Sequence, residues 1–135
     1  MPQEHLPVER HAITHKFTVG GSKAYVTVGL YSDGRVGEIN IVMPASPLPG
    51  YMTREQLEMM ARAAVTERAF LDAFSTAIST AIQWGTPLED LISKFRYIRD
   101  AHEGPTSNPT IPIANGIIDY VFRWVEARFP AGGEK

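Results

Sequence analysis

The sequence contains no cysteine. Disulfides, cysteine zinc sites, thiolate nucleophiles and cysteine-based radical or redox chemistry are therefore excluded for these 135 residues. An excess of one charge is also missing, because 13 Lys and Arg oppose 15 Asp and Glu for a net charge of −2. This balance argues against a polybasic binder of duplex DNA or RNA, although it allows a small cationic pocket.

Long apolar runs are absent as well. No apolar stretch approaches the ~18 residues of a membrane-spanning helix, and residues 1–10 lack the apolar core of a secretory signal. A chain of 135 residues is long enough to bury a core and has the usual length of one domain. We therefore expect a soluble, cytoplasmic, single-domain protein that binds no membrane.

Apolar and polar residues alternate between residues 11 and 43, which is typical of β-strands. Three runs share this pattern, with the aligned residues Ile13, His15, Phe17 and Val19; Val26, Val28 and Leu30; and Ile39, Ile41 and Met43. Gly20-Gly21 and Asp33-Gly34 separate the runs and suit tight hairpin turns. The pattern predicts a three-stranded antiparallel meander.

Helical spacing dominates the second half of the chain. Thr53 and Gln56 form a capping-box start, and residues 54–84 contain neither Gly nor Pro. This stretch predicts one long helix, or two helices with a break near residues 65–67. Further on, the sequence predicts a second helix that runs to about Tyr97. Thr86 caps it, Pro87 is its first residue and Glu89 completes the capping box. A loop over 100–112 and a last helix over about 113–129 follow.

These elements define an α+β fold, in which a three-stranded antiparallel meander is followed by three or four helices packed on one face. We expect a flexible arm at residues 1–10, a single domain at 11–129 and a disordered tail at 130–135. The sequence shows no P-loop, no dinucleotide fingerprint and no Gly-x-Ser-x-Gly motif. His11 and His15 would lie roughly 13 Å apart on a strand, which disfavours a metal site. We therefore expect no cofactor, no metal and no catalysis.

Two segments carry candidate binding residues. The run from Lys94 to Arg99 interleaves cations with aromatic rings. Its aromatic candidates are Phe95 and Tyr97, and its cationic candidates are Arg96 and Arg99. Such residues stack on bases and bind phosphates, but they also suit a helix end where cations favour the dipole. The last helix carries a polar stripe that is either a solvated face or a ligand-facing one, made of Asn115, Asp119, Arg123 and Glu126.

The long helix has a polar face with almost no charge. Its members are small or uncharged polar residues, namely Ser75, Thr76, Ser79, Thr80 and Gln83. Solvated helix faces usually carry Lys and Glu. This face therefore indicates either close packing against another chain or helix, with self-association into a homo-oligomer (a dimer or higher), or a weakly polar surface.

Three ordered motifs resemble a known family: KFTVGGSKAYVTVGLYSDGRVGEINI, AISTAIQWGTPLEDLISKF and IIDYVFRW. They look like the C-terminal (TSCPD-like) domain of adenosylcobalamin-dependent ribonucleotide reductases. Arg99 and Gly104 also fall where that domain has an Arg and a Gly, whereas residues 49–66 depart from the pattern as an inserted helical stretch. Ribonucleotide reduction needs a thiyl radical and a thiol pair, so a cysteine-free chain is not expected to be the reductase.

Free-standing versions of this domain are similar to the phage-encoded Thoeris anti-defence proteins of the first type. That resemblance implies a non-catalytic, oligomeric sponge that traps cyclic ADP-ribose-type or cyclic oligonucleotide signals in a bacterial host cytoplasm. By the same resemblance, the base would stack on Phe95 or Tyr97, and Asn108 would bind the ribose or base. The phosphates would contact Arg123, Arg128 and Arg99 or Arg96. The alternative is a detached reductase-like module that binds a partner protein or an allosteric nucleotide.

Overall fold

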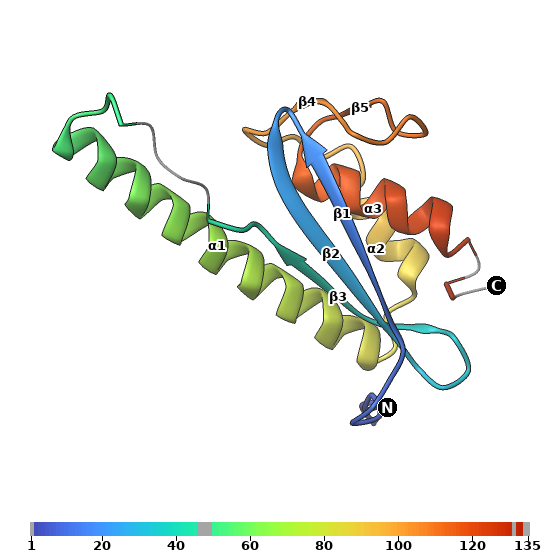
Figure 1. Cartoon of the computed structure of the whole chain (residues 1–135). Helices are drawn as coiled ribbons and strands as arrows, with labels where there is room; N and C mark the ends of the chain where they lie inside the picture. Colours follow the sequence, from blue (N-terminus) through green and yellow to red (C-terminus); the bar gives the residue numbers. More distant parts are fainter. Residues whose placement is uncertain (1, 46–49, 131, 134–135) are drawn as a thin grey trace.

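The computed structural model describes residues 2–45, 50–130 and 132–133, and within them it shows one antiparallel sheet of three strands and a smaller two-stranded ladder (Figure 1). The sheet has the order β1–β2–β3, with bounds β1 (Ala12–Val19), β2 (Ser22–Leu30) and β3 (Val36–Val42). Three helices follow, and the small ladder lies between the last two: α1 (Arg54–Gln83), α2 (Leu88–Phe95), β4 (Gly104–Pro105), β5 (Ile113–Ala114) and α3 (Ile117–Arg128). The predicted α+β class is confirmed.

The turn between β1 and β2 needs two glycines. Val19 pairs with Ser22, which leaves only Gly20 and Gly21 in the turn, and both have positive φ values of 58° and 84°. A Cβ at Gly20 would also lie 2.6 Å from the carbonyl oxygen of His102. The glycine pair therefore provides both the left-handed backbone of the hairpin and room for the later loop that passes over it.

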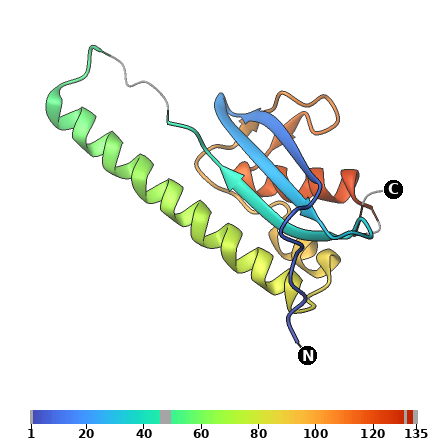
Figure 2. The same ribbon diagram turned by 60° about the horizontal axis from the view of Figure 1, so that its bottom comes forward.

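The core lies between one face of the sheet and the helices α2 and α3 (Figures 1 and 2). Alternate strand residues form the sheet side of this core, as their period of two predicts. The largest fully buried strand residues are Phe17, Val19, Val26, Val28, Ile39 and Ile41, and those of α3 include Ile117, Tyr120, Val121, Phe122 and Val125.

Helix α1 runs beside β3 and bonds to the free edge of that strand. Its small polar side chains satisfy backbone groups that no further strand pairs with. Ser75 Oγ accepts from Ile41 N–H at 3.0 Å. Ser79 Oγ accepts from Ile39 N–H at 3.0 Å and donates to Ile39 O at 3.1 Å. Gln83 Nε2 donates to Gly37 O at 3.2 Å. Three of the five residues of the predicted association face thus bond within the chain, while Thr76 and Thr80 stay exposed.

Helix α1 is one unbroken helix, so a break near 65–67 is wrong. Both halves of the predicted capping box are present: the Thr53 hydroxyl accepts from Gln56 N–H, and the Gln56 side chain accepts from Thr53 N–H. Gly85 follows the helix with a φ of 103°, as a C′ glycine does. No described helix combines the length and the apolarity needed to cross a bilayer.

The two later helices are shorter than their patterns predict. The residue before α2 is Pro87 rather than Thr86, and no side chain caps this helix. The helix ends at Phe95, because Tyr97 has a left-handed backbone that no α-helix continues. Helix α3 begins at Ile117 because residues 113–114 pair with β4 instead.

Both described termini make hydrogen bonds to the body of the domain, and the flexible arm and disordered tail stay predictions. The arm has no regular structure, but Glu4 N–H donates to Gln83 O at 2.8 Å, and Arg35 binds the Glu4 carboxylate at 2.7 and 2.9 Å. In the tail, the Gly132 carbonyl accepts from Val36 N–H at 3.0 Å. Residue 1 and, in the tail, residues 131 and 134–135 lie outside the described residues.

Candidate functional site: an exposed tyrosine beside two arginines

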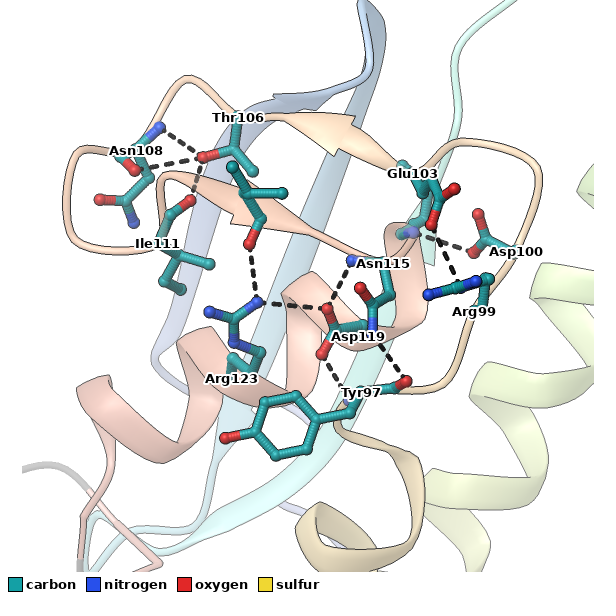
Figure 3. A network of polar contacts seen from close by, with 12 residues as sticks. Tyr97, Arg99, Asp100, Glu103, Thr106, Asn108, Ile111, Asn115, Asp119 and Arg123 are labelled. Carbon is teal, nitrogen blue, oxygen red and sulfur yellow. Dashed lines mark hydrogen bonds and ion pairs between the residues drawn. The ribbon is translucent and has the colours of Figure 1, made fainter.

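The loop after α2 presents an exposed tyrosine on a left-handed backbone (Figure 3). Tyr97 has a φ of 68°, and 60% of it is exposed. Its N–H donates to Asp119 Oδ1, and its carbonyl accepts from Asn115 Nδ2 at 2.9 Å. A non-glycine residue in this region is strained, and the two side chains from the α3 end of the fold hold it there.

A fully buried carboxylate organises this region. Asp119 lies in the first turn of α3 and is 0% exposed. Besides Tyr97 N–H, it accepts from Asn115 N–H at 2.7 Å and from Arg123 Nη1 at 3.3 Å. A buried charge is costly unless it is paired and hydrogen-bonded, and Asp119 meets both conditions. It therefore joins the loop after α2, the segment after β5 and α3 into one structure.

Two arginines lie over the ring of Tyr97. The guanidinium carbons of Arg96 and Arg123 are 5.4 and 5.5 Å from the ring centroid, within the range of cation–π attraction. Arg96 pairs with Glu126 at 2.7 Å, and Arg123 also donates to Ile113 O at 2.8 Å. Each guanidinium has five N–H donors, so these contacts leave further donors for an anion. We call Arg96, Tyr97, Asn115, Asp119 and Arg123 the Tyr97 site.

Asp100 fixes the loop that leaves the Tyr97 site. Its carboxylate accepts from His102 N–H at 2.8 Å and from Ile117 N–H, at the start of α3, at 2.9 Å. A Cβ at Gly116 would lie 2.2 Å from the Asp100 carboxyl carbon, so glycine is needed for this approach. Sequence reasoning missed Asp100, because an acidic residue 17 positions before a helix gives no local capping signal.

The structure separates the nine predicted site residues into two sets. Five of them form the Tyr97 site, and the other four lie elsewhere. Of these four, Phe95 packs in the core with its ring 5.2 Å from that of Phe74, and Arg99 pairs with Glu103 at 3.2 Å. The guanidinium of Arg128 lies 5.1 Å from the ring of Phe129.

Asn108 belongs to a second polar network on the buried side of β1. Its Nδ2 donates to the Tyr120 hydroxyl at 3.1 Å, and that hydroxyl is 2.8 Å from His15 Nε2. The His15 ring stacks on Trp124 at 4.8 Å. Burial lowers the pKa of His15 from its usual 6.5. The alternation of β1 does place His15 on the core-facing side with Phe17, but its partners come from α3 and the loop before it.

A third cluster ties α1 to the first hairpin. His102 Nδ1 lies 2.8 Å from Ser22 Oγ, and His102 Nε2 lies 2.7 Å from Glu67 Oε2. The three side chains line a cavity of about 430 Å³ together with Lys23 and Arg68. Sequence reasoning missed this cluster because its members come from three distant segments. Among the described residues no group of three or more His, Asp or Glu side chains is arranged to hold a metal ion.

The chain belongs to the TSCPD domain family, which matches residues 2–129. Its relatives include vitamin B12-dependent ribonucleotide reductases. The protein from Rhodopirellula baltica is 38% identical over 132 residues, which cover 98% of this chain and 11% of the reductase. That from Streptomyces avermitilis is 35% identical over 121 residues, or 90% and 11% of the two chains, and that from Bradyrhizobium diazoefficiens is 34% identical over 122 residues, or 90% and 8%.

The chain thus spans about a tenth of the length of these curated relatives. No solved structure matches. The resemblance to a domain of these reductases is confirmed, whereas the resemblance to the Thoeris proteins is not shown by these findings.

Proposed function

We propose that this chain is a non-catalytic nucleotide-binding module of the reductase type, with its ligand at the Tyr97 site. Membership of the TSCPD family supports the kind of module. The observation that carries the choice of ligand is Tyr97 itself. The residue is 60% exposed although its backbone is strained and is held by a buried carboxylate. Strain of this kind is concentrated at functional sites.

The chemistry of the Tyr97 site suits a nucleotide. An exposed aromatic ring gives a stacking surface for a base, worth about 1–3 kcal/mol. Arg96 and Arg123, both within 5.5 Å of the ring centroid, place two fixed positive charges where phosphates attached to that base would lie. The protein's net charge of −2 offers no comparable general attraction, so binding would depend on this local pair.

The four residues around Tyr97 supply no reacting group, which supports binding without turnover. The carboxylate of Asp119 is fully buried and accepts three N–H donors. The guanidinium groups of Arg96 and Arg123 carry donors and no acceptor, and the Asn115 side chain is an amide. None of these groups acts as a nucleophile or a general base at neutral pH.

The first prediction tests the Tyr97 site by calorimetric titration with ATP, dATP and ADP-ribose. Tyr97→Asn removes the ring, while asparagine tolerates the left-handed backbone. We expect at least one of these nucleotides to bind the native chain, and Tyr97→Asn to weaken its binding roughly tenfold to a hundredfold. The matched control is Tyr51→Asn, which removes another tyrosine that is 86% exposed. Equal affinity of Tyr97→Asn and the native chain would exclude Tyr97 from the site.

A second candidate is a sponge for cyclic ADP-ribose-type signals. The specific observation in its favour is the pair of arginines beside one ring, because these messengers carry a pyrophosphate next to a base. Incubation with cyclic ADP-ribose isomers, heat denaturation and chromatography distinguishes the outcomes. Intact ligand recovered from the protein fraction supports the sponge, and a converted product would establish an enzyme instead. Binding of ATP or dATP alone favours the reductase-type module, and no binding of any nucleotide leaves a partner protein as its ligand.

A further inference from the structure

The first half of α1 makes few contacts with the rest of the domain apart from the pair between Glu67, near the end of this half, and His102. Figures 1 and 2 both show this half extending away from the sheet, and no residue from Arg54 to Phe70 is buried. Helices shorter than about 12–15 residues are marginal in water, and in proteins most helical stability comes from packing an apolar face. The projecting half of α1 thus lacks the packing that normally holds a helix of its length.

An uncharged stripe follows the solvent side of α1 along most of its length. Its positions alternate in steps of four and three residues, which is the heptad spacing of a helix–helix seam. All eight are exposed: Met59, Ala63, Thr66, Phe70, Ala73, Ala77, Thr80 and Trp84. We call this set the outer stripe. Helical geometry places it opposite Leu71, Ser75 and Ile78, which face the body of the domain.

The outer stripe differs from an ordinary solvent face. Exposed helix faces usually carry Lys, Arg, Glu or Asp, whereas from Ala73 to Trp84 the chain has no charged residue. Between Met59 and Trp84, Arg62 is the charged residue that lies closest to the stripe around the helix circumference. Two of the stripe's large side chains, Met59 and Phe70, are 67% and 59% exposed. These features favour burial of the stripe against another helix.

We propose that the outer stripe pairs with that of a second copy of this chain, in an antiparallel arrangement with its two-fold axis near Arg68. The spacing carries this choice, since reversal about residue 68 brings each of the two large stripe residues between positions 59 and 77 opposite a smaller one. The facing pairs are Met59 with Ala77, Ala63 with Ala73, and Thr66 with Phe70. A parallel pair would instead place Phe70 on Phe70 and Met59 on Met59, with the small side chains facing one another, so the seam would be unevenly packed. The antiparallel pair is self-complementary, as an isologous interface requires.

The buried area meets the lower limit for a specific dimer. The six paired residues from Met59 to Ala77 are all exposed in the single chain. With ordinary side-chain areas, two copies would bury on the order of 1,000 Å², close to the minimum for a specific interface. This pairing uses a different face of α1 from the Ser75, Ser79 and Gln83 contacts to β3.

Sedimentation analysis of the full chain tests the proposal, and we expect a dimer. Ala73→Glu places two unpaired charges in the seam and should convert the dimer to a monomer, with the helical circular dichroism retained. Val65→Glu is the matched control, because Val65 is 57% exposed on the same helix but lies off the outer stripe. A monomeric native chain, or a dimer that Ala73→Glu leaves intact, would overturn the proposal.

The absence of native cysteine allows a direct test of the orientation. Ala63→Cys and Ala73→Cys are prepared separately, mixed and oxidised. Antiparallel pairing predicts disulfides mainly between the two different variants, because residue 63 of one copy faces residue 73 of the other. Cross-linking of each variant mainly with itself would show a parallel pair and overturn the proposed arrangement.

Discussion

Asp119 is the residue on which the Tyr97 site depends. It is completely buried and accepts hydrogen bonds from Tyr97, Asn115 and Arg123. Asp119 and Arg123 are four residues apart on α3, and their ion pair forms, with Arg123 Nη1 3.3 Å from Asp119 Oδ2. The other two donors, the N–H groups of Tyr97 and Asn115, could not be predicted. They lie in loops, and no local sequence pattern indicates that these loops approach α3.

Our second prediction concerns this carboxylate. Asp119→Asn keeps the shape of the side chain but turns one acceptor oxygen into a donor that faces N–H groups. We expect the free energy of unfolding in urea to fall by about 2–4 kcal/mol, because buried donors lose their acceptor. The control is Glu126→Gln, which removes an exposed partner of Arg96 and should change stability by less than about 1 kcal/mol. Equal stability of Asp119→Asn and the native chain would contradict this role of Asp119.

His15 gives the third prediction, a pH dependence of stability. Burial lowers the pKa of His15 in the folded state, so the unfolded chain binds the proton more readily. The contribution of His15 to the free energy of unfolding is therefore fully present above about pH 6.5. It is lost as the pH falls toward the lowered pKa of the folded state. Urea unfolding between pH 7.5 and pH 5 measures this loss. The loss should shrink in His15→Gln and persist in His11→Gln, whose histidine is exposed.

At the scale of elements, the contact between α1 and β3 replaces a fourth strand. The edge of β3 would otherwise expose backbone groups that attract further strands. Ser75 and Ser79 bond to the backbone of Ile41 and Ile39, and the helix covers this edge over the length of the strand. The uncharged face that sequence reasoning assigned to another chain is thus partly explained by a contact within this one. The predicted homo-oligomer remains untested.

The fourth prediction follows from this edge. Ser75→Ala and Ser79→Ala leave the N–H groups of Ile41 and Ile39 without an acceptor, and each change should cost about 1–3 kcal/mol of unfolding free energy. Hydrogen exchange of these two amides should speed up by more than that of their neighbours. Thr76→Ala is the control, because the Thr76 hydroxyl bonds only to Asp72 O within the helix. Unchanged exchange at both amides would contradict the proposed edge contact.

At the scale of the whole molecule, periodicity and turn chemistry predicted most of the fold. The three strands, the capping box at Thr53 and the glycine turns were all confirmed, since each depends on residues close together in the sequence. The errors lay at residues 86–87, 96–97 and 113–116. At 96–97 the left-handed backbone of Tyr97, and at 113–114 the pairing of β4 with β5, override local helix signals.

The sequence by itself determined which chemistry is available: no cysteine, near-balanced charge, and cations and aromatic rings gathered after the second helix. Only the tertiary structure decided how these residues are used. It packed the partly buried Phe95 against the core and buried Asp119. It also tied Asn108 to Tyr120 and left Tyr97 exposed beside Arg96 and Arg123. The reason is physical. A side chain's role depends on its burial and on its hydrogen-bond partners, and those partners lie in segments that only folding brings together.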